Sequence, residues 1–361
     1  MFPFRSRRSN LTRRLSKATR RGVAGCSMQT GDVTVLLKKL QDAQLDTLAK
    51  AVESRGREPT GCVLLPYKEE PHLLCCQTWR WPDLRSVDEI RRLPSCRSKV
   101  DKVYVCCNPY HWSRICVPDC PPPPYSRTNE EMLRPEDRAP SEVPLLCRDS
   151  YLGSFTTNGD TPSNPSEWCK LAYWELSERV GPLFSVDRPC FNVFGDVAHP
   201  DGLSLETLAM TGQRNGYRGG GDGRGGRSPP PDAAVQRTRC KIGLGVTLSR
   251  EEDSCVWVYN RSDNPIFVNS ATLDVAPPPE QSHMLVACHQ PTRVPADHCL
   301  CVYDPHKAAQ NYGWTFTHPI YGPVDPNSIR ISFVKGWGQK YSRREIKSCP
   351  CWLEILLAPC R

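Results

Sequence analysis

The C-terminal stretch, residues 329–361, constrains the fold more than any other part of the chain. Its first five residues, IRISF, alternate apolar and polar side chains, a period typical of a strand with one buried face. The run CWLEILL at 351–357 is apolar enough for a strand that is covered on both faces. We therefore predict a rigid pair of strands that holds out the loop between them.

This loop carries the sequence Lys-Gly-Trp-Gly and then a cluster of cations. The two glycines have access to backbone angles that other residues avoid, and they flank one large aromatic side chain. A solvated connector is the simplest alternative. The Gly-Trp-Gly sequence requires unusual backbone angles, and it stands close to two adjacent arginines. This combination favours a binding surface, because guanidinium groups bind phosphates through paired donors. The candidate binding residues are Lys335, Trp337, Lys340, Tyr341, Arg343 and Arg344.

The residues FVKGWGQKYSRREIKSCPCWLEILL at 333–357 resemble the end of the C-terminal Mad-homology domain of Smad proteins. CPCWLE resembles the inhibitory branch of that family. DPNSIRISF and CWLEILL look closer to the sixth vertebrate paralogue than to the seventh. Receptor-activated Smads continue into a short helix and a tail of phosphorylatable serines, whereas this sequence stops at Arg361. The resemblance therefore implies an inhibitor.

Positive charge is concentrated at the start of the chain. Residues 1–21 hold eight Arg or Lys and no acid, which equals the formal net charge of +8, so the rest of the chain is neutral. A globally basic nucleic-acid binder is therefore not indicated. We predict that residues 1–25 form a basic disordered tail, which either solubilises the protein or contacts phosphates, a membrane surface or a nuclear import receptor.

Residues 26–117 are predicted to form a small α+β domain. One amphipathic helix is expected to run from Asp32 to Gly56, because its leucines recur on one face and a glycine follows. The part LLKKLQDAQLDTLAKAV resembles a helix of the N-terminal Mad-homology domain. The chain has neither a secretory core nor an apolar run of membrane-spanning length. Its 20 cysteines are thus expected in a reducing compartment, as metal ligands or buried thiols.

Three cysteines and one histidine in this domain suit a closed, tetrahedral structural zinc site. They are Cys62, Cys96, Cys106 and His111. Their order matches the Smad pattern, and CCNPYH at 106–111 supplies the last two ligands. Spacing alone leaves other choices open, because Cys75, Cys76, Cys107 and Cys116 lie near by. Buried free thiols are the structural alternative, and a nucleophilic Cys106–His111 pair is the enzymatic one, without local groups to orient it.

The segment that follows Cys62 departs from DNA-binding Smads. In those proteins a β-hairpin between the first zinc ligand and the Trp-rich segment enters the major groove. Here only VLLPYKEEPHLLCCQT is present, with Glu69 and Glu70 where basic side chains are needed. Sequence-specific recognition of DNA through a hairpin is therefore not expected.

Residues 118–165 are predicted to be a disordered linker, because prolines and polar residues dominate and no apolar period is visible. The linker contains PPPPYSR, in which Pro122, Pro123 and Tyr125 make a Pro-Pro-x-Tyr ligand for WW domains. A proline-rich spacer is the alternative. Inhibitory Smads present their ubiquitin-ligase docking motif in the same form, so the resemblance implies recruitment of a HECT-type E3 ligase.

Residues 166–361 are predicted to form an antiparallel β-sandwich with helices and loops at its ends. Short apolar runs alternate with turn residues throughout this part, and the pattern resembles the C-terminal Mad-homology domain. Residues 213–231 interrupt the pattern with seven glycines and are interpreted as a flexible insertion, with an RNA-binding segment as the alternative. Gly243 and Gly245 indicate close packing of strands.

The resemblance as a whole implies an adaptor, not an enzyme. It would bind activated type I receptors of the TGF-β/BMP class, block receptor-activated Smads, and contact other Smads, in the cytoplasm and the nucleus. BMP-type receptors are favoured by the likeness to the sixth paralogue. The principal alternative is a zinc-containing, DNA-binding transcriptional repressor, which the missing hairpin and the neutral body disfavour.

Overall fold

The structure is a computed structural model of the whole chain. It describes residues 7–19, 30–101, 103–116, 167–195, 201–214, 232–273, 291–309, 327–338 and 340–357. The chain divides into two compact units, Met1–Ile115 and Cys116–Arg361, and each is described by itself. The predicted linker, with Pro122, Pro123 and Tyr125, and most of the predicted insertion at 213–231 lie outside the described residues.

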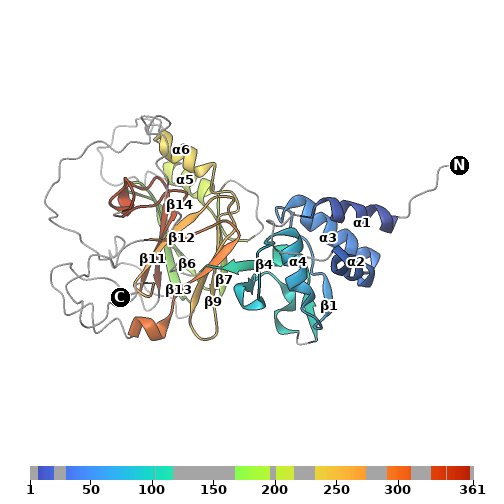
Figure 1. The fold of residues 1–361 in the computed structure, drawn as a ribbon. Coiled ribbons are helices and arrows are strands. Elements are labelled where there is room, and N and C mark those ends of the chain that lie inside the picture. Colours follow the sequence, from blue (N-terminus) through green and yellow to red (C-terminus); the bar gives the residue numbers. More distant parts are fainter. Residues whose placement is uncertain are drawn as a thin grey trace, which may run out of the picture. The chain divides into compact units, whose positions relative to one another are not determined.

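The N-terminal unit places helices against two short strand pairs (Figure 1). Apolar side chains of the helices and strands form one core that contains six leucines of α1, α2 and α3 together with Trp79 and Trp112. The helices are α1 (Arg7–Lys17), α2 (Thr30–Lys39), α3 (Asp42–Ser54) and α4 (Pro71–Trp79). The strand pairs are β1 (Leu64–Pro66) with β3 (Tyr104–Cys106), and β2 (Ile90–Arg92) with β4 (Trp112–Ile115).

The prediction of a disordered tail at residues 1–25 is wrong for its central part, which forms helix α1. Leu11 and Leu15 are four residues apart, so they share one helix face and are buried in the core. The arginines between them do not repel the domain, because Arg8 bonds to Asp42 and Arg14 pairs with Glu53 on α3. Part of the positive charge of this segment is therefore neutralised within the fold.

The prediction of a single helix from Asp32 to Gly56 is wrong. Two helices are present, because the backbone leaves the helical conformation at Gln41. The Gln41 backbone N–H donates to the Gln44 side chain, which completes a capping box and starts α3 anew. The predicted end at Gly56 is confirmed. Gly56 takes a φ of +71° and its N–H donates to the carbonyl of Ala51.

The segment between Cys62 and Trp79 contains strand β1 and helix α4 and no second strand, so the predicted absence of a hairpin here is confirmed. Glu69 and Glu70 occupy the turn between the two elements with left-handed backbone angles. Strand β1 pairs with the distant β3, which follows Cys96 in the chain.

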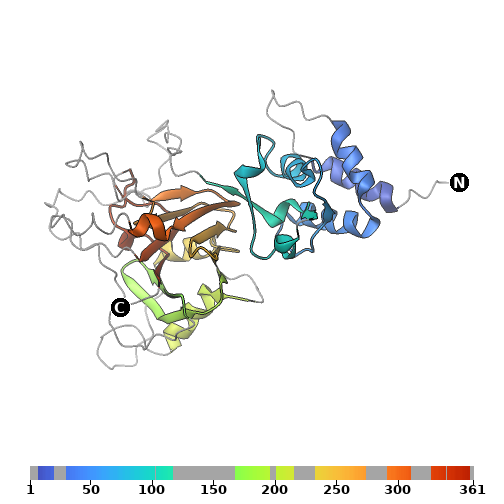
Figure 2. The ribbon, with the colours of Figure 1, turned by 90° about the horizontal axis from the view of Figure 1, so that it is seen from below.

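The C-terminal unit is a β-sandwich, as predicted (Figures 1 and 2). One sheet has the strand order β12-β11-β14-β15-β5-β6, and the other contains β13-β10-β9-β7-β8. Among the described strands, all pairings are antiparallel except the short β7–β8 pair. The core between the sheets is built mainly from valine, leucine and isoleucine side chains, with some aromatic residues and cysteines. Helices α5 (Leu205–Arg214) and α6 (Ala233–Arg239) both lie at one end of the sandwich (Figure 1).

The strands of this unit have the following bounds. They are β5 (Cys169–Glu175), β6 (Glu178–Val186), β7 (Cys190–Phe194), β8 (Leu203–Ser204), β9 (Val246–Arg250), β10 (Val256–Asn260), β11 (Ile266–Ser270), β12 (Thr292–Val294), β13 (His298–Tyr303), β14 (Ser328–Phe333) and β15 (Trp352–Leu357). The close approach predicted at Gly245 is confirmed, since a Cβ there would lie 2.0 Å from the carbonyl oxygen of Val193. The same prediction is wrong for Gly243, where a Cβ would meet no atom within 4 Å.

Strands β14 and β15 form the predicted pair, but β14 is not half-buried. All of its residues are buried, including those with polar side chains. Arg330 lies opposite Glu354 in the register and forms an ion pair with it, with 3.6 Å between Nε and Oε1. Ser332 Oγ donates to the carbonyl of Lys335. Polar partners on neighbouring backbone and strands therefore replace the solvent that the alternating pattern suggested.

No helix in the described ranges is both long enough and apolar enough to span a membrane.

Candidate functional site

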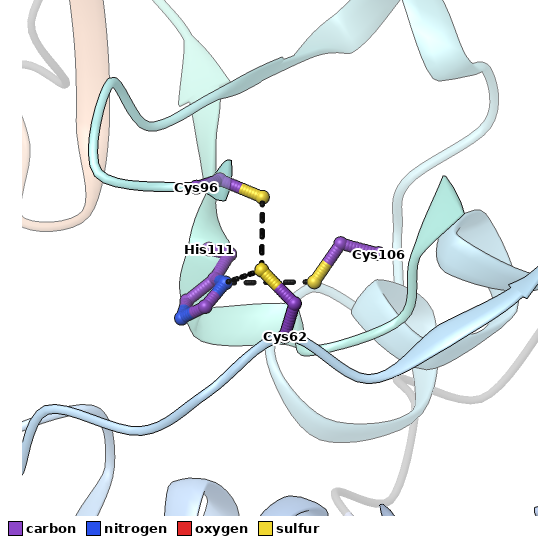
Figure 3. Close-up of side chains that lie close together, drawn as sticks. All are labelled: Cys62, Cys96, Cys106 and His111. Carbon is purple, nitrogen blue, oxygen red and sulfur yellow. Dashed lines mark hydrogen bonds between the residues drawn. The ribbon is translucent and has the colours of Figure 1, made fainter. Parts of the chain in front are cut away.

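The four predicted metal ligands converge in the N-terminal unit (Figure 3). Cys62 precedes β1, Cys96 follows β2, Cys106 ends β3, and His111 ends the short helical turn at Pro109–His111. One ligand atom from each residue lies within 4.8 Å of all the others. Cys96 and Cys106 are buried, whereas Cys62 and His111 are partly buried. The alternative cysteines Cys75, Cys76 and Cys107 do not belong to this cluster.

The spacing of the ligand atoms suits one tetrahedral zinc ion. The Sγ atoms of Cys62 and Cys96 are 3.8 Å apart. His111 Nδ1 lies 3.6 Å from the sulfur of Cys62 and 3.5 Å from that of Cys106. Zinc bonds of about 2.3 Å to sulfur and about 2.0 Å to nitrogen place two sulfurs about 3.8 Å apart and sulfur and nitrogen about 3.5 Å apart. These three separations therefore match those around zinc.

Surrounding hydrogen bonds orient the cluster. His111 Nε2 lies 3.0 Å from the carbonyl oxygen of Thr60, which accepts a hydrogen bond from the Nε2–H group. The lone pair of Nδ1 is then directed at the thiols. The Asn108 amide bonds to the hydroxyl of Thr60 and the carbonyl of Gly61. Trp112 Nε1 donates to the carbonyl of Cys106. Of the two neutral tautomers, the Thr60 contact favours the one with its proton on Nε2, which a metal bound at Nδ1 requires.

Hydrogen bonds within the cluster favour the thiolate forms of Cys62 and Cys96 by lowering their pKa values. A hydrogen bond from Cys106 lowers the pKa of Cys62 to about 6 and that of Cys96 to about 3. The same hydrogen bonds raise the pKa of Cys106. Burial lowers the pKa of His111, but its bonds to the Cys96 and Cys62 thiolates outweigh burial and raise it. Two thiolates in a buried site are stabilised by a divalent cation.

The arrangement fits a structural metal better than a nucleophile. Cys106 and His111 are within hydrogen-bonding distance, as an enzymatic pair requires. The thiols of Cys62 and Cys96, however, belong to the same cluster of potential ligand atoms. A complete set of four protein ligands leaves no open position for a substrate.

The candidate binding loop joins β14 to β15 in the C-terminal unit. Its path is held by backbone bonds, from Val334 N–H to the carbonyl of Pro265 and from Gly338 N–H to that of Arg343. Trp337 is only 6% exposed and packs in a cluster with Phe267 and Trp352. Trp337 therefore shapes the loop from inside and is not a surface contact.

Gly336 and Tyr341 form a second close contact within the loop. A Cβ at Gly336 would lie 2.6 Å from the Tyr341 ring and 3.0 Å from the ring of Phe267. Tyr341 also meets Phe267 edge to face, with 5.5 Å between the ring centroids. Only glycine leaves room for this packing, and a φ of +96° at Gly338 favours glycine there too.

The cations of the loop lie outside this aromatic cluster. Lys340 and Arg344 are exposed, and Lys335 and Arg343 are partly exposed. The structure thus brings the predicted residues together as a surface of cations on an aromatic support.

Three supporting aromatics were not among the predicted site residues. Phe267 comes from β11, and Trp174 of β5 stacks on Trp352 of β15 with 5.1 Å between centroids. Trp352 stands in the apolar run that predicted β15, so its burial could be anticipated. Phe267 and Trp174 are distant in the chain, and no sequence pattern links them to the loop.

Comparison with known proteins assigns both units to domain families. Residues 29–116 match the MH1 domain family and residues 166–358 match the MH2 domain family. The paired domains define a class of signalling proteins, and the chain belongs to the Smad family.

Two of the relatives, homologs 6 and 7, are inhibitory members of that family. Mothers against decapentaplegic homolog 6 of Gallus gallus is 40% identical, with 90% of this chain and 73% of that protein covered. Homolog 7 of Homo sapiens is 37% identical, with 89% and 76% covered. Dwarfin sma-3 of Caenorhabditis elegans is 26% identical, with 92% and 82% covered. The first two support an inhibitory Smad-like role, as predicted.

Proposed function

We propose that the protein is a non-enzymatic adaptor that binds activated type I receptors of the TGF-β/BMP class and keeps receptor-activated Smads from them. The observation that carries this proposal is the loop between β14 and β15. Buried Trp337 fixes its shape, while Lys340 and Arg344 remain exposed. A surface of this kind is ready to bind before the partner arrives, so little ordering entropy is lost.

Phosphate is the ligand chemistry that suits the loop. A receptor activated by phosphorylation presents groups of about −1.5 to −2 charge with three acceptor oxygens each. Arg343 and Arg344 offer paired donors to such groups, and Lys335 and Lys340 add compact positive charge. We expect the affinity to depend on receptor phosphorylation for this reason.

The test is a titration of the full chain with phosphorylated and unphosphorylated receptor fragments. Lys340→Glu with Arg344→Glu should weaken binding to the phosphorylated fragment at least tenfold and change binding to the other fragment little. Arg250→Glu with Lys307→Glu is the matched control, because these side chains are also exposed and lie outside the loop. Equal affinity of the wild type and the loop variant for the phosphorylated fragment would place the receptor site elsewhere.

We further propose that Pro122, Pro123 and Tyr125 recruit a HECT-type E3 ubiquitin ligase to the bound receptor. The support is the Pro-Pro-x-Tyr sequence, whose prolines favour the extended helix that WW domains bind. Tyr125→Ala should abolish binding of the segment to a WW domain, as measured by calorimetry. Retained affinity in that variant would exclude the motif as the docking site.

The cluster in the MH1 domain is proposed to hold one structural zinc ion. Cys62, Cys96, Cys106 and His111 supply the donor set, and their separations support it. Zinc at this position would cross-link three loops of a small domain and supply no chemistry to a substrate. Elemental analysis of the purified chain should find one zinc per molecule. A folded MH1 domain without the metal would contradict the assignment.

The protein is also proposed to act in both the cytoplasm and the nucleus without sequence-specific binding to DNA. The acidic turn at Glu69 and Glu70, in the place of a basic hairpin, supports the second point. Fractionation of cells, and titration with specific and scrambled duplexes at two salt concentrations, would test these points. A preference for one duplex that persists at high salt would favour the alternative function as a DNA-binding repressor.

A further inference from the structure

Helix α1 is attached to the MH1 domain by a narrow apolar contact. Leu11 and Leu15 are its buried side chains. Trp79 of α4 adds one polar contact, in which its Nε1 donates to the carbonyl of Leu15 over 3.2 Å. The helix lies before residues 29–116, where the MH1 family match is found. Its two leucines nevertheless belong to the same apolar core as side chains of α2, α3 and α4.

Ion pairs at the surface complete the attachment. Arg8 donates to Asp42 over 2.7 Å and to carbonyls at the end of α2. Arg14 meets the Glu53 carboxylate through Nε, over 2.6 Å, and through Nη2. The side chains of Asp42, Arg14 and Glu53 are exposed by two-fifths or more. The attachment therefore has an electrostatic part beside the apolar one, and this part responds to charge added to α1.

One serine on α1 has the sequence context of a kinase substrate. Arg13-Arg14-Leu15-Ser16 is the one place in the whole sequence where two arginines stand three and two positions before a serine or threonine. Basophilic kinases select this arrangement, because acidic side chains in their substrate groove bind the two guanidinium groups. Ser16 is exposed, and its hydroxyl donates to the carbonyl of Thr12 over 3.0 Å.

We propose that Ser16 is a phosphorylation site for a basophilic serine kinase, and that the phosphate releases α1 from the MH1 domain. In the transfer, Ser16 Oγ attacks the γ-phosphorus of ATP, and the new O–P bond forms as the bond to ADP breaks. The hydroxyl proton passes to a carboxylate of the kinase, and ADP leaves.

We expect the attached helix to be a poor substrate for the kinase and the released helix to be a good one. The kinase has to bind Arg14, and Arg14 is held by Glu53 while α1 is attached. The kinase therefore acts on the released helix, and modification favours the state on which it acts.

The phosphate opposes reattachment for two reasons. Ser16 lies in the last turn of α1, which ends at Lys17, so the added charge meets the negative end of the helix dipole. The helix also binds the domain as a segment with five basic and no acidic residues, facing Asp42, Asp46 and Glu53. A group of about −2 charge offsets a large part of that attraction.

The experiment treats the full chain with ATP and cAMP-dependent protein kinase, which selects arginine at these two positions. Mass spectrometry measures phosphate at Ser16, and hydrogen exchange is followed in residues 7–19. We expect phosphate at Ser16 and about tenfold faster exchange in α1, equivalent to about 1.4 kcal/mol. Exchange in α3 should not change.

Matched variants make the result decisive. Ser16→Ala should remove both the phosphate and the faster exchange, whereas Ser9→Ala on the same helix should remove neither. Glu53→Gln should speed phosphorylation several-fold by freeing Arg14. Absence of phosphate at Ser16 in both wild type and Glu53→Gln would overturn the site. Unchanged exchange in α1, or equally faster exchange in α3, would overturn release of the helix.

Discussion

The cluster in the MH1 domain and the loop in the MH2 domain are built in opposite ways. The cluster gathers Cys62, Cys96, Cys106 and His111 from separate parts of the chain into a partly buried site. The loop is one continuous stretch, and its exposed cations rest on a buried aromatic support. The first arrangement suits a site that holds a domain together, and the second suits a site that binds a partner. Substitutions should therefore affect stability at the cluster and recognition at the loop.

The largest effect is expected from loss of a metal ligand. Cys106→Ser should unfold the MH1 domain and remove its zinc, because structural zinc contributes on the order of 10 kcal/mol to folding. Cys107→Ser is the control, since Cys107 is equally buried but is not part of the cluster. Circular dichroism and elemental analysis would check both variants. Retention of the fold and the metal in Cys106→Ser would show that the cluster is not structural.

A smaller effect is expected inside the loop support. Gly336→Ala places a Cβ 2.6 Å from the Tyr341 ring, so the ring has to move or the loop has to change shape. We expect the MH2 domain to lose about 1–3 kcal/mol in chemical denaturation, and phosphate recognition to weaken as well. Gly61→Ala provides the comparison, because its nearest contact is 3.9 Å away. Equal stability of both variants and the wild type would mean that the support is not tightly packed.

A third prediction places pH sensitivity in the MH1 domain. His72 is 2% exposed and stacks on Trp112, and burial lowers its pKa to about 4. Because this value lies below the unfolded value of 6.5, the unfolded chain takes up the proton first. His72 thus contributes stability above pH 6.5 that is lost as the pH falls toward 4, by about 3 kcal/mol.

His72→Phe keeps the ring stack and removes this proton uptake. The difference in unfolding free energy between wild type and variant should therefore change between pH 6.5 and pH 4. Comparison of the two proteins cancels proton uptake by the metal ligands, which both retain. A difference that is constant with pH would disprove the assignment to His72.

The smallest effect on stability is expected from the loop cations. Lys340→Glu with Arg344→Glu should change the unfolding free energy of the MH2 domain by less than about 0.5 kcal/mol, because exposed charges contribute little to folding. Thermal unfolding of the full chain would measure this change. A large loss of stability would mean that the cations support the fold and do not stand ready for a partner.

The same contrast explains what could be predicted from the sequence. The strand pair and its loop were visible because they are continuous, with local apolar patterns that identify β14 and β15. The metal ligands needed the family resemblance, because spacing alone allowed neighbouring cysteines such as Cys107 to take part. Only the fold distinguishes them, by directing Cys106 into the cluster and burying Cys107 in the apolar core.

The errors arose where distant partners override local composition. Helix α1 was not predicted, although Leu11 and Leu15 have helical spacing, because its many arginines suggested a disordered segment. The acidic residues that neutralise those arginines lie on α3. Arg330 suggested an exposed face for β14, but its partner Glu354 lies on the neighbouring strand. In both cases the compensating charge is 24 or more residues away along the sequence, beyond the reach of a local pattern.

The most direct test of the division between the two sites is one receptor titration with two variants of the full chain. Affinity for the phosphorylated receptor fragment is measured for Cys106→Ser and for Lys340→Glu with Arg344→Glu, each beside the wild type. We predict that the first variant binds within about twofold of the wild type although its MH1 domain is unfolded, and that the second binds at least tenfold more weakly although it is folded. Loss of affinity in the Cys106→Ser variant, with full affinity in the loop variant, would contradict the account.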